Sequence, residues 1–382
     1  LQLSRSTFHF LLQRNNRIQY PKMNFTGETS RVASNLSTTS PNSEASSYYI
    51  LSKETVLYHK KICFFGIVPC IFVAGVILNL LCCAMFYKIK NKSSTVILLI
   101  GLATTDILIV CNAMVNTLFF TSKTYGIPFT EEQQVKSIPF FATFINNIPG
   151  RTGNLITLVI SVERMLCVLM PLKIRQYSTK TTSIIAVILC YTLSTLFCLP
   201  FMFLYKTSTT YSNTTGQYVT KLQPTALALN SDLTDGMYIS IETALKFIPV
   251  LGVLLLSSIT VIVVVFNARR RLTFTEGHLK SAASAKQENQ VTKTLLVVTF
   301  TFVGFQMPNT ILRMMSFLDN SSNTASRYTN NIYEVAQTSS YMILLLTSVV
   351  NFIIYYNTSS TYNERFRKMF GCTRRFLNKR QY

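Results

Sequence analysis

Residues 161–173 read SVERMLCVLMPLK and bring two charged side chains, Glu163 and Arg164, to the end of the apolar run LITLVIS at 155–161. A charge inside a membrane costs free energy unless it is paired or lies near the membrane surface. At one end of a membrane-crossing helix, the two residues can pair and keep part of their hydration. The stretch therefore predicts a transmembrane helix that ends in an ion pair, although an ordinary boundary pair without a further role would look the same.

The rest of the chain repeats the apolar pattern. Of its 382 residues, 49% are hydrophobic and 13% are charged, whereas about a quarter of a soluble domain is charged. A helix needs about 20 apolar residues to cross the hydrocarbon core, and seven runs reach that length, at 62–87, 95–120, 138–162, 182–205, 238–266, 292–318 and 332–356. They lack the period-two alternation of barrel strands. The sequence thus predicts an all-α membrane protein with a seven-transmembrane helix bundle.

Basic residues are unevenly distributed along the chain, whose formal net charge is +21. The segments 88–92, 164–180, 269–293 and 365–380 hold 20 of the 36 lysines and arginines. These are alternate connections and the C-terminal tail, so the positive-inside rule places them in the cytosol and the N-terminus outside the cell. This distribution argues against nucleic acid as a partner. It predicts a multi-pass protein of the plasma membrane, surrounded by membrane lipids.

Two tails flank the predicted membrane domain at 62–356. Residues 1–61 form an outer tail that we expect to be disordered, because it is rich in Ser, Thr and Asn. Met23 can be the true start, in which case 1–22 is not part of the mature chain. Asn-X-Ser/Thr sequons in the predicted outer regions indicate N-glycosylation at Asn24, Asn35, Asn213 and Asn320.

The C-terminal tail at 357–382 carries an amphipathic pattern in TYNERFRKMFGCTRRF, at 361–376. One face of this helix holds the apolar residues Tyr362, Phe366, Met369 and Phe370. Such a helix can lie on the anionic inner leaflet of the membrane. Cys372 follows it directly, where S-palmitoylation would add a lipid anchor; an unmodified thiol is the alternative.

Isolated polar residues and prolines interrupt the apolar runs in a fixed order. They are Asn79, Asp106 in LATTD at 102–106, the triplet Glu163-Arg164-Met165, Pro249, Pro308 in FVGFQMP at 302–308, and Asn351 with Tyr355 in NFIIY at 351–355. Over about 62–372, this set resembles the motifs of rhodopsin-like (class A) G-protein-coupled receptors. The resemblance implies a receptor, with an extracellular ligand and a heterotrimeric G protein as partners. Metal-ligand spacings, phosphate loops and nucleophile motifs that would suggest an enzyme are missing.

The resemblance also implies roles for the residues of the second and third helices. Asp106, with Asn79 and Asn351, would form a polar site in the bundle core that holds a sodium ion or water; no other cofactor is expected. Glu163 would hold Arg164 in the resting state. On activation, Arg164 would turn toward the G protein.

The sixth and seventh helices would supply the remaining switch residues. Phe302 and Pro308 would bend the sixth helix, and Tyr355 would move inward to complete the active state. The chain departs from the family pattern where Gln306 replaces a Trp and Phe352 replaces a Pro, and the usual outer disulfide has no cysteines. These departures leave a non-signalling decoy receptor of the same fold as an alternative.

Two longer stretches narrow the resemblance within the family. RTGNLITLVISVERMLCVLMPLK at 151–173 and TSVVNFIIYYNTSSTYNERFRKMF at 347–370 resemble invertebrate FMRFamide-type neuropeptide receptors. They are at least as similar to the chemosensory-type receptors of molluscs. The resemblance implies a neuropeptide ligand, with a chemosensory receptor for small molecules as the alternative.

Polar residues near the outer ends of three runs are candidates for a ligand pocket, namely Asn146, Arg151, Gln306, Asn309 and Glu334. Asn146 precedes Arg164 by 18 residues, which is about five helical turns, so both would project from one face. Arg151, about two turns inside the predicted outer boundary, can pair with an acidic ligand group or a peptide C-terminus. The alternative is a structural pair with an acidic neighbour such as Glu242.

Overall fold

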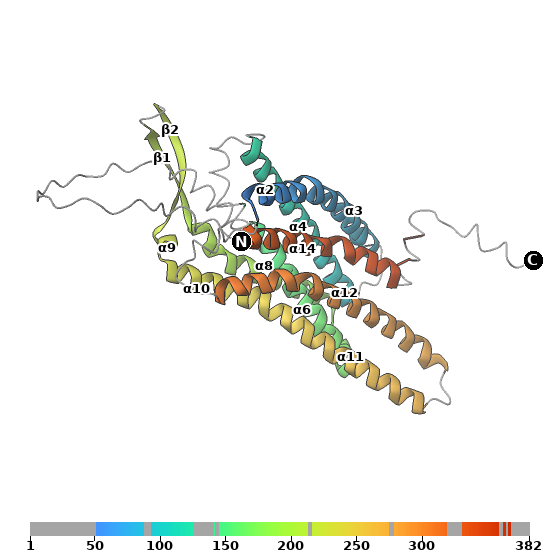
Figure 1. The fold of residues 1–382 in the computed structure, drawn as a ribbon. Helices are drawn as coiled ribbons and strands as arrows, with labels where there is room; N and C mark the ends of the chain where they lie inside the picture. The colour runs from blue at the N-terminus through green and yellow to red at the C-terminus, as the bar shows by residue number, and fades with distance from the viewer. Residues whose placement is uncertain are drawn as a thin grey trace, which may run out of the picture.

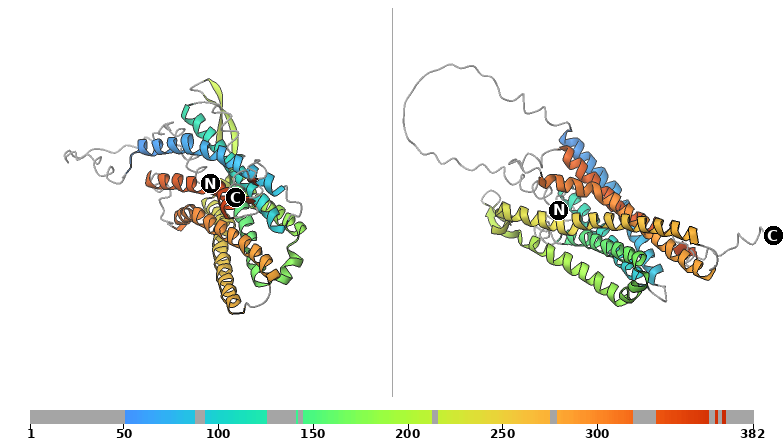
Figure 2. Two further views of the ribbon diagram at one scale, coloured as in Figure 1. Left: turned by 90° about the vertical axis from the view of Figure 1, so that its right-hand side faces the viewer. Right: turned by 90° about the horizontal axis from the view of Figure 1, so that it is seen from below.

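The computed structural model describes residues 51–87, 93–125, 141, 145–212, 216–274, 279–318, 331–358, 362–363 and 366–367. Their long helices lie side by side in an elongated bundle, and a two-stranded hairpin projects from one end (Figure 1). Figure 2 shows the same bundle along its length and from below. We call the hairpin end the outer end and the opposite end the inner end, following the topology predicted from the charges.

The elements follow in chain order, with π-helical and 3-10 turns labelled η. They are α2 (Lys53–Lys61), η1 (Ile62–Ile67), α3 (Val68–Tyr87), α4 (Ser94–Tyr125), η3 (Ile145–Asn147), α6 (Ile148–Leu169), α7 (Pro171–Tyr177), α8 (Lys180–Cys198), η4 (Leu199–Phe203), β1 (Tyr205–Ser212), β2 (Gln217–Pro224), α9 (Ala226–Leu229), α10 (Ser231–Glu242), η5 (Thr243–Phe247), α11 (Ile248–Phe274), α12 (Leu279–Leu318) and α14 (Asn331–Thr358).

Within the described residues, six helical segments have the length and mean hydropathy of a membrane span: Lys53–Tyr87, Ser94–Ser122, Ile145–Leu169, Lys180–Phe203, Asp232–Asn267 and Asn331–Thr358. A further long helix, α12, has 40 residues and packs against α11 and α14. Its outer half contains Gln306, Asn309 and Arg313, which lower its mean hydropathy. Together these helices agree with the predicted seven-helix bundle.

The outward face of α8 shows how the bundle meets lipid. Ile184, Ile188 and Leu193 are exposed, whereas Ser183 and Ser194 on the same helix are buried. In water an apolar surface of this extent would drive association. In a bilayer the lipid hydrocarbon chains cover this surface. Apolar residues outside and polar residues inside are therefore the pattern expected of a transmembrane helix.

The third long helix is described from η3 and α6 onward. The apolar run starts at 138, but α6 begins at Ile148, with Pro149 in its first turn. Proline suits this position because the first backbone N–H groups of a helix have no partner within the helix. Arg151 therefore lies in the first turn of α6 rather than two turns inside the helix, and Asn146 lies in the preceding turn η3.

Between η4 and α9 the chain forms a β-hairpin that the apolar runs did not predict. Strands β1 and β2 pair antiparallel, from Tyr205 opposite Pro224 to Ser212 opposite Gln217. Tyr211 and Tyr218 face each other across the strands, with ring centroids 5.3 Å apart. Gly216 has a φ of 65°, a backbone conformation that favours glycine in tight turns.

At the inner end, aromatic side chains join α14 to the start of the tail. The ring of Phe352 lies 5.8 Å from that of Tyr362 and 5.9 Å from that of Phe366. Tyr362 also packs against Phe86 and Tyr355. These described members of the predicted amphipathic face thus contact the bundle, while Met369, Phe370 and Cys372 lie outside the described residues.

Candidate functional site

At the inner end of α6, Glu163 and Arg164 are buried and pair with each other at 2.9 Å, from Nη2 to Oε1. The hydroxyl of Thr95, at the start of α4, accepts a hydrogen bond from Arg164 Nη2 and donates one to Glu163 Oε1 at 3.1 Å. Ser178, which follows α7, donates to the same oxygen at 2.8 Å. The two charges are therefore compensated within the protein and held against two neighbouring segments.

In the middle of the bundle, Asp106 accepts hydrogen bonds from α14. Asn351 Nδ2 donates to Asp106 Oδ2 at 2.9 Å, and Ser348 Oγ donates to Oδ1 at 3.3 Å. Asn79 does not bond to the carboxylate; its Nδ2 donates to the carbonyls of Gly75 and Ser348 at 2.8 and 2.7 Å. Asn79 therefore joins this network through the backbone beside Ser348, a residue that the sequence analysis did not single out.

The oxygen atoms around Asp106 are suitable ligands for a sodium ion. Asp106 is 4% exposed, and a buried carboxylate is costly unless it is compensated by partners or a cation. Among the described residues, Asn351 Oδ1 is buried and has no hydrogen-bond partner. Sodium is a hard cation like Ca²⁺ and Mg²⁺, for which oxygen ligands are preferred. The Asp106 carboxylate, the Ser348 hydroxyl and the Asn351 carbonyl oxygen would supply them.

The two sixth-helix residues implied by the motifs lie where a bend is possible. Pro308 is inside α12, where it removes one backbone hydrogen bond and weakens the helix locally. Phe302 is buried and packs with Val250 and Val253 of α11. A bend at Pro308 would therefore move Phe302 and the inner half of α12 relative to α11.

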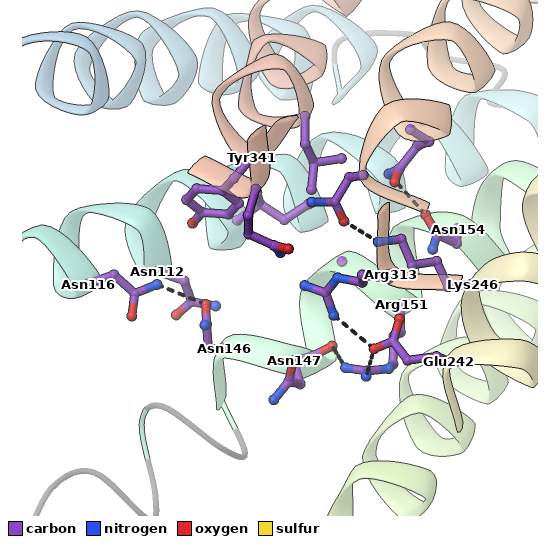
Figure 3. Close-up of a pocket in the computed structure, with 16 residues that line it drawn as sticks. Asn112, Asn116, Asn146, Asn147, Arg151, Asn154, Glu242, Lys246, Arg313 and Tyr341 are labelled. Carbon is purple, nitrogen blue, oxygen red and sulfur yellow. Dashed lines mark hydrogen bonds and ion pairs between the residues drawn. The ribbon is translucent and has the colours of Figure 1, made fainter. Parts of the chain in front are cut away.

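At the outer end, a cavity of about 810 Å³, counting the part open to solvent, lies between five of the long helical segments. Figure 3 shows that polar side chains from each of them point into it. The lining residues are Ile109, Asn112, Asn116, Asn146, Asn147, Gly150, Arg151, Asn154, Glu242, Lys246, Gln306, Asn309, Arg313, Gln337, Tyr341 and Leu344. Four of the predicted pocket residues, Asn146, Arg151, Gln306 and Asn309, are thus brought together.

An ion cluster forms one wall of this cavity (Figure 3). Arg151 Nη2 lies 2.6 Å from Glu242 Oε1, which is the structural pairing left open above. Arg313 Nη1 lies 3.0 Å from the same oxygen. Lys246, one turn further along the chain in η5, donates a hydrogen bond to Asn309 Oδ1. Charged groups of α6, α10 and α12 therefore meet at one carboxylate oxygen, and Lys246 of η5 lines the same cavity.

Lys246 and Arg313 were not among the predicted pocket residues. Lys246 is the one basic residue of the apolar run 238–266, and Arg313 lies deep inside the run 292–318, whose other basic residue, Lys293, is at its edge. That placement alone is a signal, because an ionisable side chain at membrane depth almost always faces the interior of the bundle.

Below the ion cluster, Gln306 joins α12 to α6. Its Nε2 donates to Asn154 Oδ1 at 3.1 Å, and Asn154 Nδ2 donates to the carbonyl of Leu245 at 3.3 Å. Gln306 Oε1 is buried and has no partner among the described residues. A polar contact between three helical segments thus occupies the position where the family pattern has a Trp.

Glu334 is not among the residues that line this cavity. It lies in the first turn of α14, beside α2, and its Oε2 is 2.6 Å from Lys60 Nζ. Both side chains are about a quarter exposed. The predicted glycosylation sites Asn24, Asn35, Asn213 and Asn320 lie outside the described residues.

Comparison with known protein families matched residues 78–355 to the 7 transmembrane receptor (rhodopsin family). The match covers well over half of the chain. The protein belongs to this family. It is therefore a multi-pass plasma-membrane receptor that signals through heterotrimeric G proteins in response to an extracellular ligand, and it is not an enzyme.

The matched range includes every motif described above, from Asn79 to Tyr355. A search of curated proteins found no match to the receptor. Family membership gives the class of protein and leaves open which ligand it binds, so the ligand must be inferred from the outer cavity.

Proposed function

We propose that this receptor is activated by an extracellular neuropeptide that binds in the outer cavity. Side-chain amides dominate the cavity wall, and each offers both a donor and an acceptor. Peptide bonds have the same complement, so a peptide segment could exchange hydrogen bonds with them. The amide residues at the cavity are Asn112, Asn116, Asn146, Asn147, Asn154, Gln306, Asn309 and Gln337.

The observation that carries the signalling part of the proposal is the closed pair of Glu163 and Arg164 at the other end of α6. In this geometry Arg164 is engaged by Glu163 and Thr95. A ligand that favours a second state of the bundle would shift the population toward it. In that state Arg164 leaves Glu163, α12 bends at Pro308, and Tyr355 moves inward.

The test is Arg164→Ala in cells that express the full chain. We expect G-protein dissociation on challenge with pooled neuropeptides to be lost, while surface expression and peptide binding persist, because Arg164 lies far from the cavity. Lys180→Ala is the matched control, since Lys180 is an exposed basic residue at the start of α8. Signalling that survived Arg164→Ala would contradict the role assigned to this residue.

A chemosensory receptor for small molecules is the second candidate. The outer cavity lies between helices of the bundle and is lined by convergent polar side chains, which is a common location for small-molecule sites. A response to amino acids or odorants but not to peptides would favour it. Silence toward all of them, with confirmed surface expression, would favour a non-signalling decoy.

A further inference from the structure

The outer cavity carries an excess of positive charge. Among its described lining residues, Arg151 and Arg313 carry permanent positive charges, Lys246 is a further basic residue, and Glu242 is the one carboxylate. Three of these side chains are buried, with Arg151 5% exposed, Lys246 7% and Glu242 3%, while the Arg313 side chain is 16% exposed. Charges that water does not screen interact more strongly than surface charges, so an uncompensated positive potential persists in the cavity.

Because Arg151 shares the Glu242 carboxylate with Arg313, not every N–H group of the Arg151 guanidinium has a hydrogen-bond acceptor. Arg151 and Arg313 both bond to the same oxygen, Glu242 Oε1. Arg151 Nη1 donates to the Asn147 carbonyl at 3.0 Å, and its Nε is buried without a partner among the described residues. A guanidinium has five N–H donors in a fixed fork that matches a carboxylate. The cluster therefore retains donors as well as charge.

We propose that this cavity recognises its ligand through a carboxylate, placed between Arg313, Arg151 and Lys246. The proposal rests on the proposed function, in which the outer cavity is the ligand site, and adds the chemical class of the group that is bound. For a peptide this group is the free C-terminal carboxylate. A peptide with an amidated C-terminus would bring no negative charge and would leave the excess uncompensated.

The probes for this inference are matched acids and amides of the same shape. N-acetylglycine and N-acetylglycinamide differ only in the charged group, as do acetyl-trialanine and its C-terminal amide. We would measure the melting temperature of the purified full chain in lipid nanodiscs, with each probe at millimolar concentration and equal ionic strength. Binding to the folded state raises this temperature by mass action.

We expect each acid to raise the melting temperature by about 2–4 °C at concentrations well above its dissociation constant, and each amide to have a clearly smaller effect. An effect of acetyl-trialanine at lower concentration than N-acetylglycine would assign the carboxylate to a peptide. An equal or weaker effect would assign it to a small acid. Both results support a carboxylate site.

Variants locate the effect in the cavity. Arg313→Gln should remove most of the acid-minus-amide difference, and the fold should tolerate it because Glu242 keeps its contact with Arg151. Glu242→Gln should increase the difference, since it frees both guanidinium groups for the ligand. Lys206→Gln is the matched control, because Lys206 is an exposed basic residue on β1, away from the cavity.

The inference would be overturned if amides stabilised the receptor as well as acids, if no probe stabilised it, or if the acid effect survived Arg313→Gln unchanged. This experiment does not involve a G protein. Arg164→Ala should leave the acid effect intact, so a failed signalling assay and a failed carboxylate site give different results.

Discussion

The side-chain amide of Gln306 donates a hydrogen bond to Asn154 across 3.1 Å, which joins α12 to α6. The bond lies two residues before Pro308, the residue at which α12 can bend. Asn154 in turn bonds to the backbone of η5. Contacts of a ligand in the proposed site with α6, η5 or α12 would therefore act on the same polar link, next to the proposed hinge at Pro308.

Gln306→Leu should raise the basal activity of the receptor. The substitution removes a bond made in the state where Glu163 holds Arg164, and it leaves Asn154 Oδ1 without its donor. A buried hydrogen bond contributes about 1 kcal/mol, so the active fraction should rise about fivefold. G-protein dissociation without ligand measures it. Thr310→Val is the control, since within the described part of the chain the Thr310 hydroxyl bonds only to the carbonyl of Gln306 in its own helix. Equal basal activity in the two variants would refute the link.

Asp106→Asn should abolish a dependence of stability on sodium. Replacing sodium by N-methylglucamine, an organic cation too large for the site, should lower the melting temperature of the wild type by several degrees because bound ions stabilise the folded state. The variant should give the same value in both salts. Asp232→Asn, at an exposed site on α10, should behave as the wild type. If the melting temperature of the wild type were the same in both salts, the assignment of a sodium site to Asp106 would be wrong.

Phe352→Ala should destabilise the inner end of the bundle. Phe352 contacts the rings of Tyr356, Tyr362 and Phe366, and truncating a buried Phe typically costs roughly 3–5 kcal/mol. Thermal unfolding in nanodiscs measures the loss. Ile353→Ala, at an exposed position on the lipid side, should cost much less. A loss no larger than that of Ile353→Ala would show that the aromatic cluster contributes little.

The bundle could be predicted because its determinants are local in the sequence. Each membrane helix is visible in the sequence as an apolar run. The pairing of Glu163 with Arg164 could be predicted because the two residues are adjacent in the chain. The pairing of Arg151 with Glu242 was one of two alternatives, because it joins residues 91 positions apart. Choosing between the two alternatives requires knowing that α10 lies beside the first turn of α6. The pattern of apolar residues along the sequence does not show which helices are neighbours.

Other parts of the site depend on contacts that the sequence pattern does not contain. Thr95 and Ser178 are ordinary hydroxyl residues at helix ends, and only the approach of three helices around Glu163 gives them a role. Phe352 was treated as a departure from the family pattern. Its packing on Tyr362 and Phe366 depends on where the tail turns back toward α14.

The π-helical turn η5 affects how the cavity wall responds to a change in chain length. A π turn contains about one residue more than an α-helical turn, and η5 lies between Glu242 and α11. Deleting one residue within η5, such as Ala244, would leave an α-helical turn that covers nearly the same rotation, so Glu242 would keep its direction toward Arg151 and Arg313. A deletion in regular α-helix would instead rotate the flanking segments by about 100° relative to each other. The extra residue of η5 is therefore one that the helix could lose without separating Glu242 from the arginines.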